Sequence, residues 1–304
     1  MTKIVLSTGN VMSGGPSIIR KRGSGTRSNL ELINSLRDNF TSAQQDYAPP
    51  VNGSGATSKA SPEHWTEQVG NVLYVPRIDW QGAGLRDEAS QYEITVKLFL
   101  LQGTPVEGRH QYAKEALELV GKELGIQTVD LLVVSFPNLS FEGNCEWAAD
   151  KNNAEQGNLD EEVETWKVFE QLQSQGLVKK LGVAEFGSEK LGAFINRTSI
   201  TPAVNQINLK NCCDVPPPLK KVAEEHSVEL NVHTDCTDVL PQGTIRELLG
   251  PQGAGLLAAD KSVTTNGGLK GDVAPQWVAR YMAFVKDRGV IENKGYFAGA
   301  ELRQ

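Results

Sequence analysis

Polar side chains lie within or directly after the apolar, strand-like runs of this sequence. They are Asp79, Lys97, Ser135, Glu185, Gln206, His233 with Asp235, and Lys294. Lysine, histidine and carboxylate side chains can act as general acids and bases when they are positioned against a substrate. Because the carboxyl ends of parallel strands meet on one side of a sheet, we expect these residues to share one site.

Histidine and cysteine spacing disfavours a metal site. The four histidines are His64, His110, His226 and His233, and none has ligand spacing with a cysteine. Four cysteines without a CxxC pair are too few for a disulfide framework and indicate the reducing cytosol, so we expect a cytoplasmic protein. Cys212 and Cys213 are adjacent. They are either two buried small hydrophobic residues or a partly exposed thiol pair that could form a disulfide with a partner protein.

Eight apolar, β-branched runs could form the strands that position the polar residues. They are 4–7, 71–78, 92–101, 130–136, 178–186, 203–209, 229–233 and 289–292. The clearest helical patterns cover 113–124, 158–176, 216–222 and 275–284. In the second of these, Asn158 and Glu161 have the spacing of a capping box. Strands that alternate with helices predict an α/β fold of the (β/α)8 TIM barrel type, with a doubly wound sheet as the alternative.

Length and composition are typical of one globular α/β domain. We expect residues 1–304 to form a single domain with three flexible, low-complexity surface excursions at 41–62, 142–157 and 241–275. The net charge of −7 argues against a nucleic-acid partner, because phosphates attract basic surfaces. There is no run of 18 apolar residues, so we expect no membrane span.

Two consecutive strand-like segments resemble the aldo-keto reductase superfamily. They are 178–186, with the sequence VKKLGVAEF, and 202–207, with the sequence PAVNQI. Within that superfamily the chain is similar to the family of glutamate–cysteine ligase regulatory (modifier) subunits, a non-catalytic branch. The segments that carry this likeness are 205–217 and 277–296. The resemblance implies an aldo-keto reductase-like barrel.

The reductase family implies a catalytic tetrad of Asp, Tyr, Lys and His, and the sequence departs from it. Asp79 matches the Asp, but Gly84 stands at the Tyr position and Ser135 at the His position. Besides Asp79, only Lys97 remains of the tetrad, and a lone lysine at a strand end is often an ion-pair partner. Because glycine cannot donate a proton, we expect no catalytic residues.

The residues that bind the nicotinamide cofactor in reductases are matched only in part. Gln206 stands at the carboxamide position and Lys294 at the 2′-phosphate position. Ala184 and Glu185 replace a Ser-Asn pair, His233 replaces a stacking Tyr, and Asp235 falls where the diphosphate would pass. An anion there would repel phosphate. We therefore expect no cofactor, with weak NADPH binding through the vestigial candidates Lys97, Gln206 and Lys294 as the most that could persist.

Two functions follow from the resemblance. The first is a regulatory subunit that forms a heterodimer with the glutamate–cysteine ligase catalytic subunit, raises its glutamate affinity and relieves glutathione feedback inhibition. The alternative is an NADPH-dependent aldo-keto reductase with a degenerate tetrad. Gly84 and Ser135 favour the first, in which Cys212 and Cys213 are candidate partner or redox residues, and Trp147 is either a partner anchor or a packing residue.

Overall fold

The fold is built on one ten-stranded mixed sheet. The computed structural model describes residues 2–13, 28–49, 60–209, 214–236, 238–258 and 269–303. The strands are β1 (Thr2–Ser7), β2 (Glu67–Val69), β3 (Val72–Val75), β4 (Tyr92–Leu100), β5 (Val129–Ser135), β6 (Val178–Ala184), β7 (Val204–Asn208), β8 (Glu229–His233), β9 (Asp272–Val285) and β10 (Val290–Arg303). Their order is β2-β3-β1-β10-β9-β4-β5-β6-β7-β8, so β2 and β8 are the two ends of the sheet.

Five parallel strands, β4 to β8, follow the predicted alternation of strands and helices. The helices of the described residues are α2 (Ser28–Asp46), α3 (Pro62–Trp65), α4 (Arg109–Leu124), α5 (Glu146–Ala154), α6 (Leu159–Ser174), α7 (Ser188–Ile195), α8 (Pro217–Glu225) and α9 (Thr244–Leu249). Asn158 caps α6 as predicted, because its Oδ1 accepts from the backbone N–H groups of Asp160 and Glu161. Glu162, rather than Glu161, returns the bond to the backbone of Asn158. The predicted α/β class is confirmed.

The C-terminal part of the sheet differs from the predicted eight-stranded arrangement. The expected helix over 275–284 is wrong, because these residues lie in β9, and the expected strand at 289–292 is the beginning of the much longer β10. The two strands form an antiparallel hairpin that lies between β1 and β4. Together with β2, which the sequence did not predict, β9 brings the sheet to ten strands where eight were expected.

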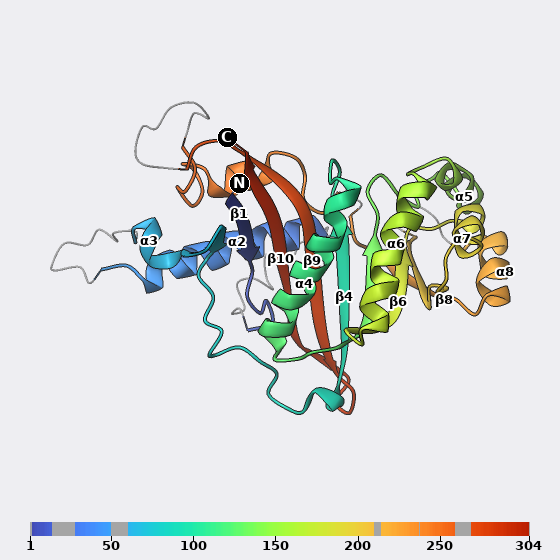
Figure 1. The fold of residues 1–304 in the computed structure, drawn as a ribbon, viewed down its shortest axis with the longest axis horizontal. Helices are drawn as coiled ribbons and strands as arrows, with labels where there is room; N and C mark the ends of the chain where they lie inside the picture. The colour runs from blue at the N-terminus through green and yellow to red at the C-terminus, as the bar shows by residue number, and fades with distance from the viewer. Residues whose placement is uncertain are drawn as a thin grey trace.

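Helices cover the two faces of the sheet, and each face has its own hydrophobic core. Residues of α4, α6 and α7 pack on one face with Ile94, Val96 and Leu98 of β4. Residues of α2 and α9 pack on the other face with Phe99 and Leu101. Figure 1 shows α4 crossing β9 and β10 on the near side, while α2 passes behind the sheet. Alternate residues of β4 therefore face different helices, as strand geometry requires.

The three predicted excursions are more ordered than expected within the described residues. α2 continues to Asp46, α5 occupies most of 142–157, and 241–275 contains α9 and the start of β9. α5 forms because its Ala149, Asp150 and Asn153 are buried against neighbouring segments, which polar composition alone did not indicate. The adjacent Cys212 and Cys213 lie outside the described residues.

Candidate functional site

A buried carboxylate holds two cations at the position where the sequence predicted a functional centre. Lys97 of β4 donates to Asp235, with 2.9 Å between Nζ and Oδ2. Arg280 of β9 binds the same carboxylate through both terminal nitrogens, and its Nη2 lies 3.0 Å from Oδ2. The side chains of Lys97 and Asp235 are only 2% and 6% exposed. Asp235 is thus the shared counter-ion of two buried cations.

Sheet register brings these cations together. Lys97 pairs with Arg280 across β4 and β9, and Arg280 pairs with Tyr296 across β9 and β10. Directly paired residues have side chains on the same face, so the three groups form a row. Lys294, two residues before Tyr296 in β10, has its side chain on the same face. Its Nζ lies 2.5 Å from Oε1 of Glu31 in α2. The Tyr296 hydroxyl donates to the same Glu31 oxygen at 2.8 Å.

His233, at the end of β8, connects the row to a third carboxylate. Its Nδ1 accepts from the backbone N–H of Asp235 at 3.0 Å, and its Nε2 lies 2.6 Å from Glu185 Oε1. Glu185 follows β6 and has a left-handed backbone with φ of 65°. Such a conformation is strained for a residue other than glycine and persists only where its surroundings fix it.

Side chains of α5 fix that strained segment. Asn153 donates to the carbonyls of Glu185 at 2.7 Å and Ser140 at 2.8 Å, and it accepts from the N–H of Gly187 at 2.6 Å. Asp150 accepts from the backbone N–H of Ser188 at 2.6 Å, at the start of α7. The helix within the region predicted to be a flexible excursion therefore positions Glu185.

The electrostatics of the cluster keep Asp235 ionised. Burial acts to raise the pKa of its carboxyl group, but the charges of Arg280 and Lys97 outweigh burial and lower this pKa well below its usual range. Burial, together with Glu31, raises the pKa of Tyr296, so its hydroxyl remains a hydrogen-bond donor. Lys97 and Arg280 share the Asp235 carboxylate, Lys294 pairs with Glu31, and Glu185 lies against His233.

The structure does not bring all of the predicted tetrad positions together. Residues next to Asp79 and Gly84 pack on the α4 face, where the Gly84 N–H donates to the carbonyl of Glu123 in α4. Lys97 lies on the opposite face with Arg280. Ser135 pairs with Phe99 and so shares the Lys97 face. Gly84 lies on the α4 side of the sheet, so a different side chain at position 84 could not place a proton donor beside Lys97.

Gln206 lies in β7 between Ala184 and Asn231, with a buried Oε1 that has no hydrogen-bond partner among the described residues.

The sequence pattern indicated four residues of the charged cluster, Lys97, Lys294, His233 and Asp235, but not Arg280, Glu31 or Tyr296. Arg280 and Tyr296 lie within the segment that carried the resemblance. Their proximity was hidden because 275–284 was interpreted as a helix, which does not place Arg280 beside Lys97.

The cluster does not fit the phosphates of a nicotinamide dinucleotide. The three cations of the cluster, Lys97, Arg280 and Lys294, are already paired with carboxylates of this chain. The Asp235 carboxylate is fixed between Lys97 and Arg280 and would repel a diphosphate. Phosphate binding would therefore require breaking buried ion pairs.

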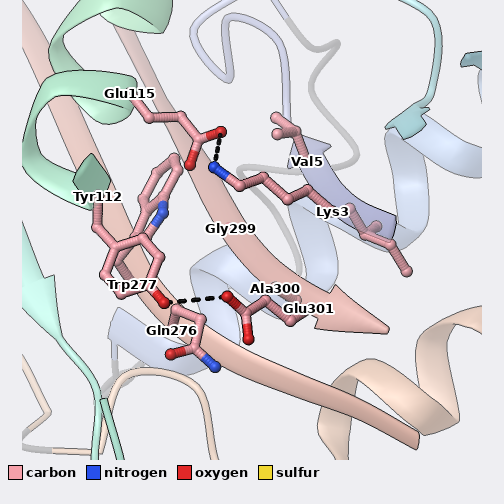
Figure 2. A pocket seen from close by; sticks show the side chains of 10 residues that line it. Lys3, Val5, Tyr112, Glu115, Gln276, Trp277, Gly299, Ala300 and Glu301 are labelled. Carbon is pink, nitrogen blue, oxygen red and sulfur yellow. Dashed lines mark hydrogen bonds and ion pairs between the residues drawn. The ribbon is translucent and has the colours of Figure 1, made fainter. Parts of the chain in front are cut away.

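A recess on the α4 face of the sheet is lined by residues other than those of the charged cluster. Figure 2 shows the Lys3–Glu115 ion pair and the hydrogen bond from Tyr112 to Glu301 beside the Trp277 indole. The recess is partly open to solvent, and none of the charged cluster lines it. In the described parts of the chain, no helix is long and apolar enough to span a membrane, and no cluster of three His, Cys, Asp or Glu side chains is arranged to bind a metal.

Comparisons with known proteins identify the family. The Schizosaccharomyces pombe protein named putative glutamate–cysteine ligase regulatory subunit is 28% identical over 74% of this chain and 77% of its own length. The Homo sapiens glutamate–cysteine ligase regulatory subunit is 23% identical over 71% of this chain and 69% of its own length. A solved Bombyx mori aldo-keto reductase in complex with NADP is 21% identical, with 45% of this chain and 40% of that chain covered and a TM-score of 0.32. The model of the aldo/keto reductase family matches residues 67–248. This chain therefore belongs to the aldo/keto reductase family.

Proposed function

We propose that this chain is a non-catalytic regulatory subunit of glutamate–cysteine ligase. In this role it binds the ligase catalytic subunit as a heterodimer, raises its affinity for glutamate and weakens feedback inhibition by glutathione. The similarity to proteins named as regulatory subunits of this ligase supports the choice of partner. The effect on the ligase is an allosteric one, exerted through contact rather than through chemistry in this chain.

The engagement of Lys97 is the observation that supports a non-catalytic role most directly. In this chain Lys97 is bound to Asp235 and lies beside Arg280, and no tyrosine stands at position 84. A reductase needs a positioned acid to protonate the carbonyl oxygen, which contributes about 10²–10⁴-fold to the rate. The ion pair and the missing acid together support a structural function for Lys97.

The proposal is tested by mixing the purified chain with the ligase catalytic subunit. Size-exclusion chromatography should give a one-to-one complex. Saturating complex formation should lower the glutamate concentration needed for half-maximal rate and raise the glutathione concentration needed for inhibition, by about 5–150-fold for a typical coupling energy. A stable complex with unchanged ligase kinetics would overturn the regulatory proposal.

The alternative function, an NADPH-dependent reductase, is tested in parallel. We expect no oxidation of NADPH above background with a panel of aldehydes and ketones, and at most weak NADPH binding. A Gly84→Tyr variant should remain inactive, since residue 84 lies on the α4 side of the sheet and Lys97 on the other. Turnover by the wild-type chain that disappears in Lys97→Ala would instead establish reductase activity.

A further inference from the structure

Gln276 is the extra residue of a β-bulge in β9. Trp277 pairs with Gly299 of β10, and Pro275 pairs with the next residue of β10, so Gln276 has no partner in that strand. Strict alternation would turn its side chain away from the α4 face, on which Trp277 packs. The bulge instead lets both side chains line the recess on the α4 face (Figure 2). Bulges re-aim side chains in this way beside functional sites.

The side-chain carbonyl of Gln276 is buried without a hydrogen-bond donor. The residue is 2% exposed, and its Oε1 has no partner among the described residues. Its Nε2 donates to the carbonyl of Ala274 at 3.2 Å. Reversing the amide would bring two carbonyl oxygens together, so the unpartnered end is the acceptor. Because a buried acceptor without a donor is unfavourable, a ligand that donates to it is stabilised there.

The carboxylates of the recess carry more charge than its lysine balances. Lys3 lies opposite Glu301 in the register of β1 and β10, but its Nζ binds Glu115 of α4 at 3.3 Å. Glu301 accepts from the Tyr112 hydroxyl at 3.1 Å, and no ion pair joins it to a cation in the described part of the chain. Burial, the hydrogen bond to Glu301 and the charges of Glu301 and Glu115 raise the pKa of Tyr112 to about 12, against an opposing effect of Arg303. The recess is therefore negative.

We propose that this recess binds the ammonium head of a small primary amine. Its free space is about that of one water molecule, which an ammonium group matches and a guanidinium or quaternary ammonium exceeds. An ammonium has three donors and no acceptor, so it can donate to Gln276 Oε1 and to the Glu301 carboxylate. A water molecule would satisfy Gln276 but would not neutralise Glu301. The solvent-facing side leaves room for the alkyl chain.

Nuclear magnetic resonance of the isotope-labelled full chain tests this site, with n-propylammonium chloride as the probe at neutral pH. The indole N–H of Trp277 is assigned through its covalent neighbours among the five tryptophans. We expect propylammonium to shift this signal saturably, with a dissociation constant in the millimolar range. Propan-1-ol lacks the charge, tetramethylammonium lacks N–H donors, and neither should shift it at matched ionic strength. The absence of a saturable shift, or an equal shift with propan-1-ol, would leave only water in the recess and overturn the proposal.

Variants of the two acceptors test the geometry. Glu301→Gln retains the shape of the side chain and removes its charge, so we expect propylammonium to bind about tenfold more weakly. Gln276→Met removes the buried acceptor and should also weaken binding. Glu118→Gln is the matched control, because it changes an exposed carboxylate of α4 that does not line the recess, and its affinity should equal that of the wild type. Glu301 is partly exposed, so Glu301→Gln should fold, and an unchanged affinity in that variant would by itself overturn the proposal.

The proposal does not depend on the regulatory function. The measurement uses this chain alone, so failure to bind the amine would leave the interaction with the ligase catalytic subunit untouched. Failure to bind the ligase would equally leave the amine site standing.

Discussion

Asp235 is the residue on which the charged cluster depends, because it is the counter-ion of both Lys97 and Arg280. Asp235→Asn would leave two buried cations without their carboxylate. Breaking a buried ion pair by removing one partner costs about 3–5 kcal/mol. We therefore expect the free energy of unfolding, measured by urea denaturation at neutral pH, to fall by about that amount.

Two variants provide the controls for Asp235→Asn. Lys97→Met leaves Asp235 paired with Arg280, so its loss of stability should be clearly smaller. Glu247→Gln makes the same change of carboxylate to amide in an exposed pair with Arg37, where about 0–1 kcal/mol is expected. If Asp235→Asn were as mild as Glu247→Gln, the cluster would not be the stabilising centre that its geometry indicates.

At the scale of elements, α5 is predicted to hold the strained segment after β6. Asn153→Ala removes three hydrogen bonds of a fully buried amide, two of them to Glu185 and Gly187. Unpaired buried groups cost about 1–3 kcal/mol each, so we expect a loss of about 3 kcal/mol in the free energy of unfolding. The neighbouring Asn152 is exposed, and Asn152→Ala should change stability by less than about 0.5 kcal/mol. Equal effects of the two variants would contradict this role for α5.

The contact between α4 and β10 predicts a pH dependence in the alkaline range. Burial, followed by the hydrogen bond to Glu301, raises the pKa of Tyr112 to about 12. In the unfolded chain a tyrosine ionises near pH 10, at about its ordinary pKa. The unfolded state therefore releases this proton first, and the stabilisation present below about pH 10 is lost as the pH rises toward 12.

Urea denaturation at neutral pH and at about pH 11 checks the Tyr112 prediction. Tyr112→Phe should lose less stability than the wild type between the two conditions, because it has no hydroxyl to titrate. Tyr47→Phe, at a more exposed tyrosine, should behave as the wild type does. A wild-type slope in Tyr112→Phe would show that other groups control the alkaline response.

The sequence was informative where local pattern determines structure. Seven of the eight apolar runs coincide with β1 and β3 to β8, because buried parallel strands have a strong local signature. The β9–β10 hairpin was missed because Trp277, Tyr281 and Phe284 also fit helical spacing, and pairing with β1 and β4 decides between the two. Val285 and Val290 flank a four-residue turn that ends in Gly289, with φ of 64°, and this was the available hairpin signal.

Local sequence pattern also could not show which residues of the candidate site contact one another. Asp235 and Lys97 could be identified by type and position, but their pairing depends on which face of the sheet each strand presents. Arg280 and Tyr296 join the site only through strand register, and Glu31 only through the packing of α2. Such contacts are long-range in sequence, so no local pattern predicts them.

At the scale of the whole molecule, the sheet separates two sets of residues that a reductase would need together. Lys97 lies on the face covered by α2, while the loop that contains Gly84 packs on the α4 face. The cluster around Lys97 joins β4, β9, β10, α2 and the segment after β8. Its ion pairs and hydrogen bonds thus connect α2, near the start of the described chain, with β10, near its end.

This view predicts that regulation of the ligase does not require Lys97. Lys97→Met retains the Asp235–Arg280 pair and a side chain of similar length, so the fold should persist. We expect its complex with the ligase catalytic subunit to shift the glutamate and glutathione responses as far as the wild type does. The measurement compares ligase initial rates at saturating concentrations of either chain, with the melting temperature as the control for folding. Because a reductase-dependent mechanism would need the lysine, a folded Lys97→Met that binds the ligase but fails to regulate it would assign a functional role to this cluster.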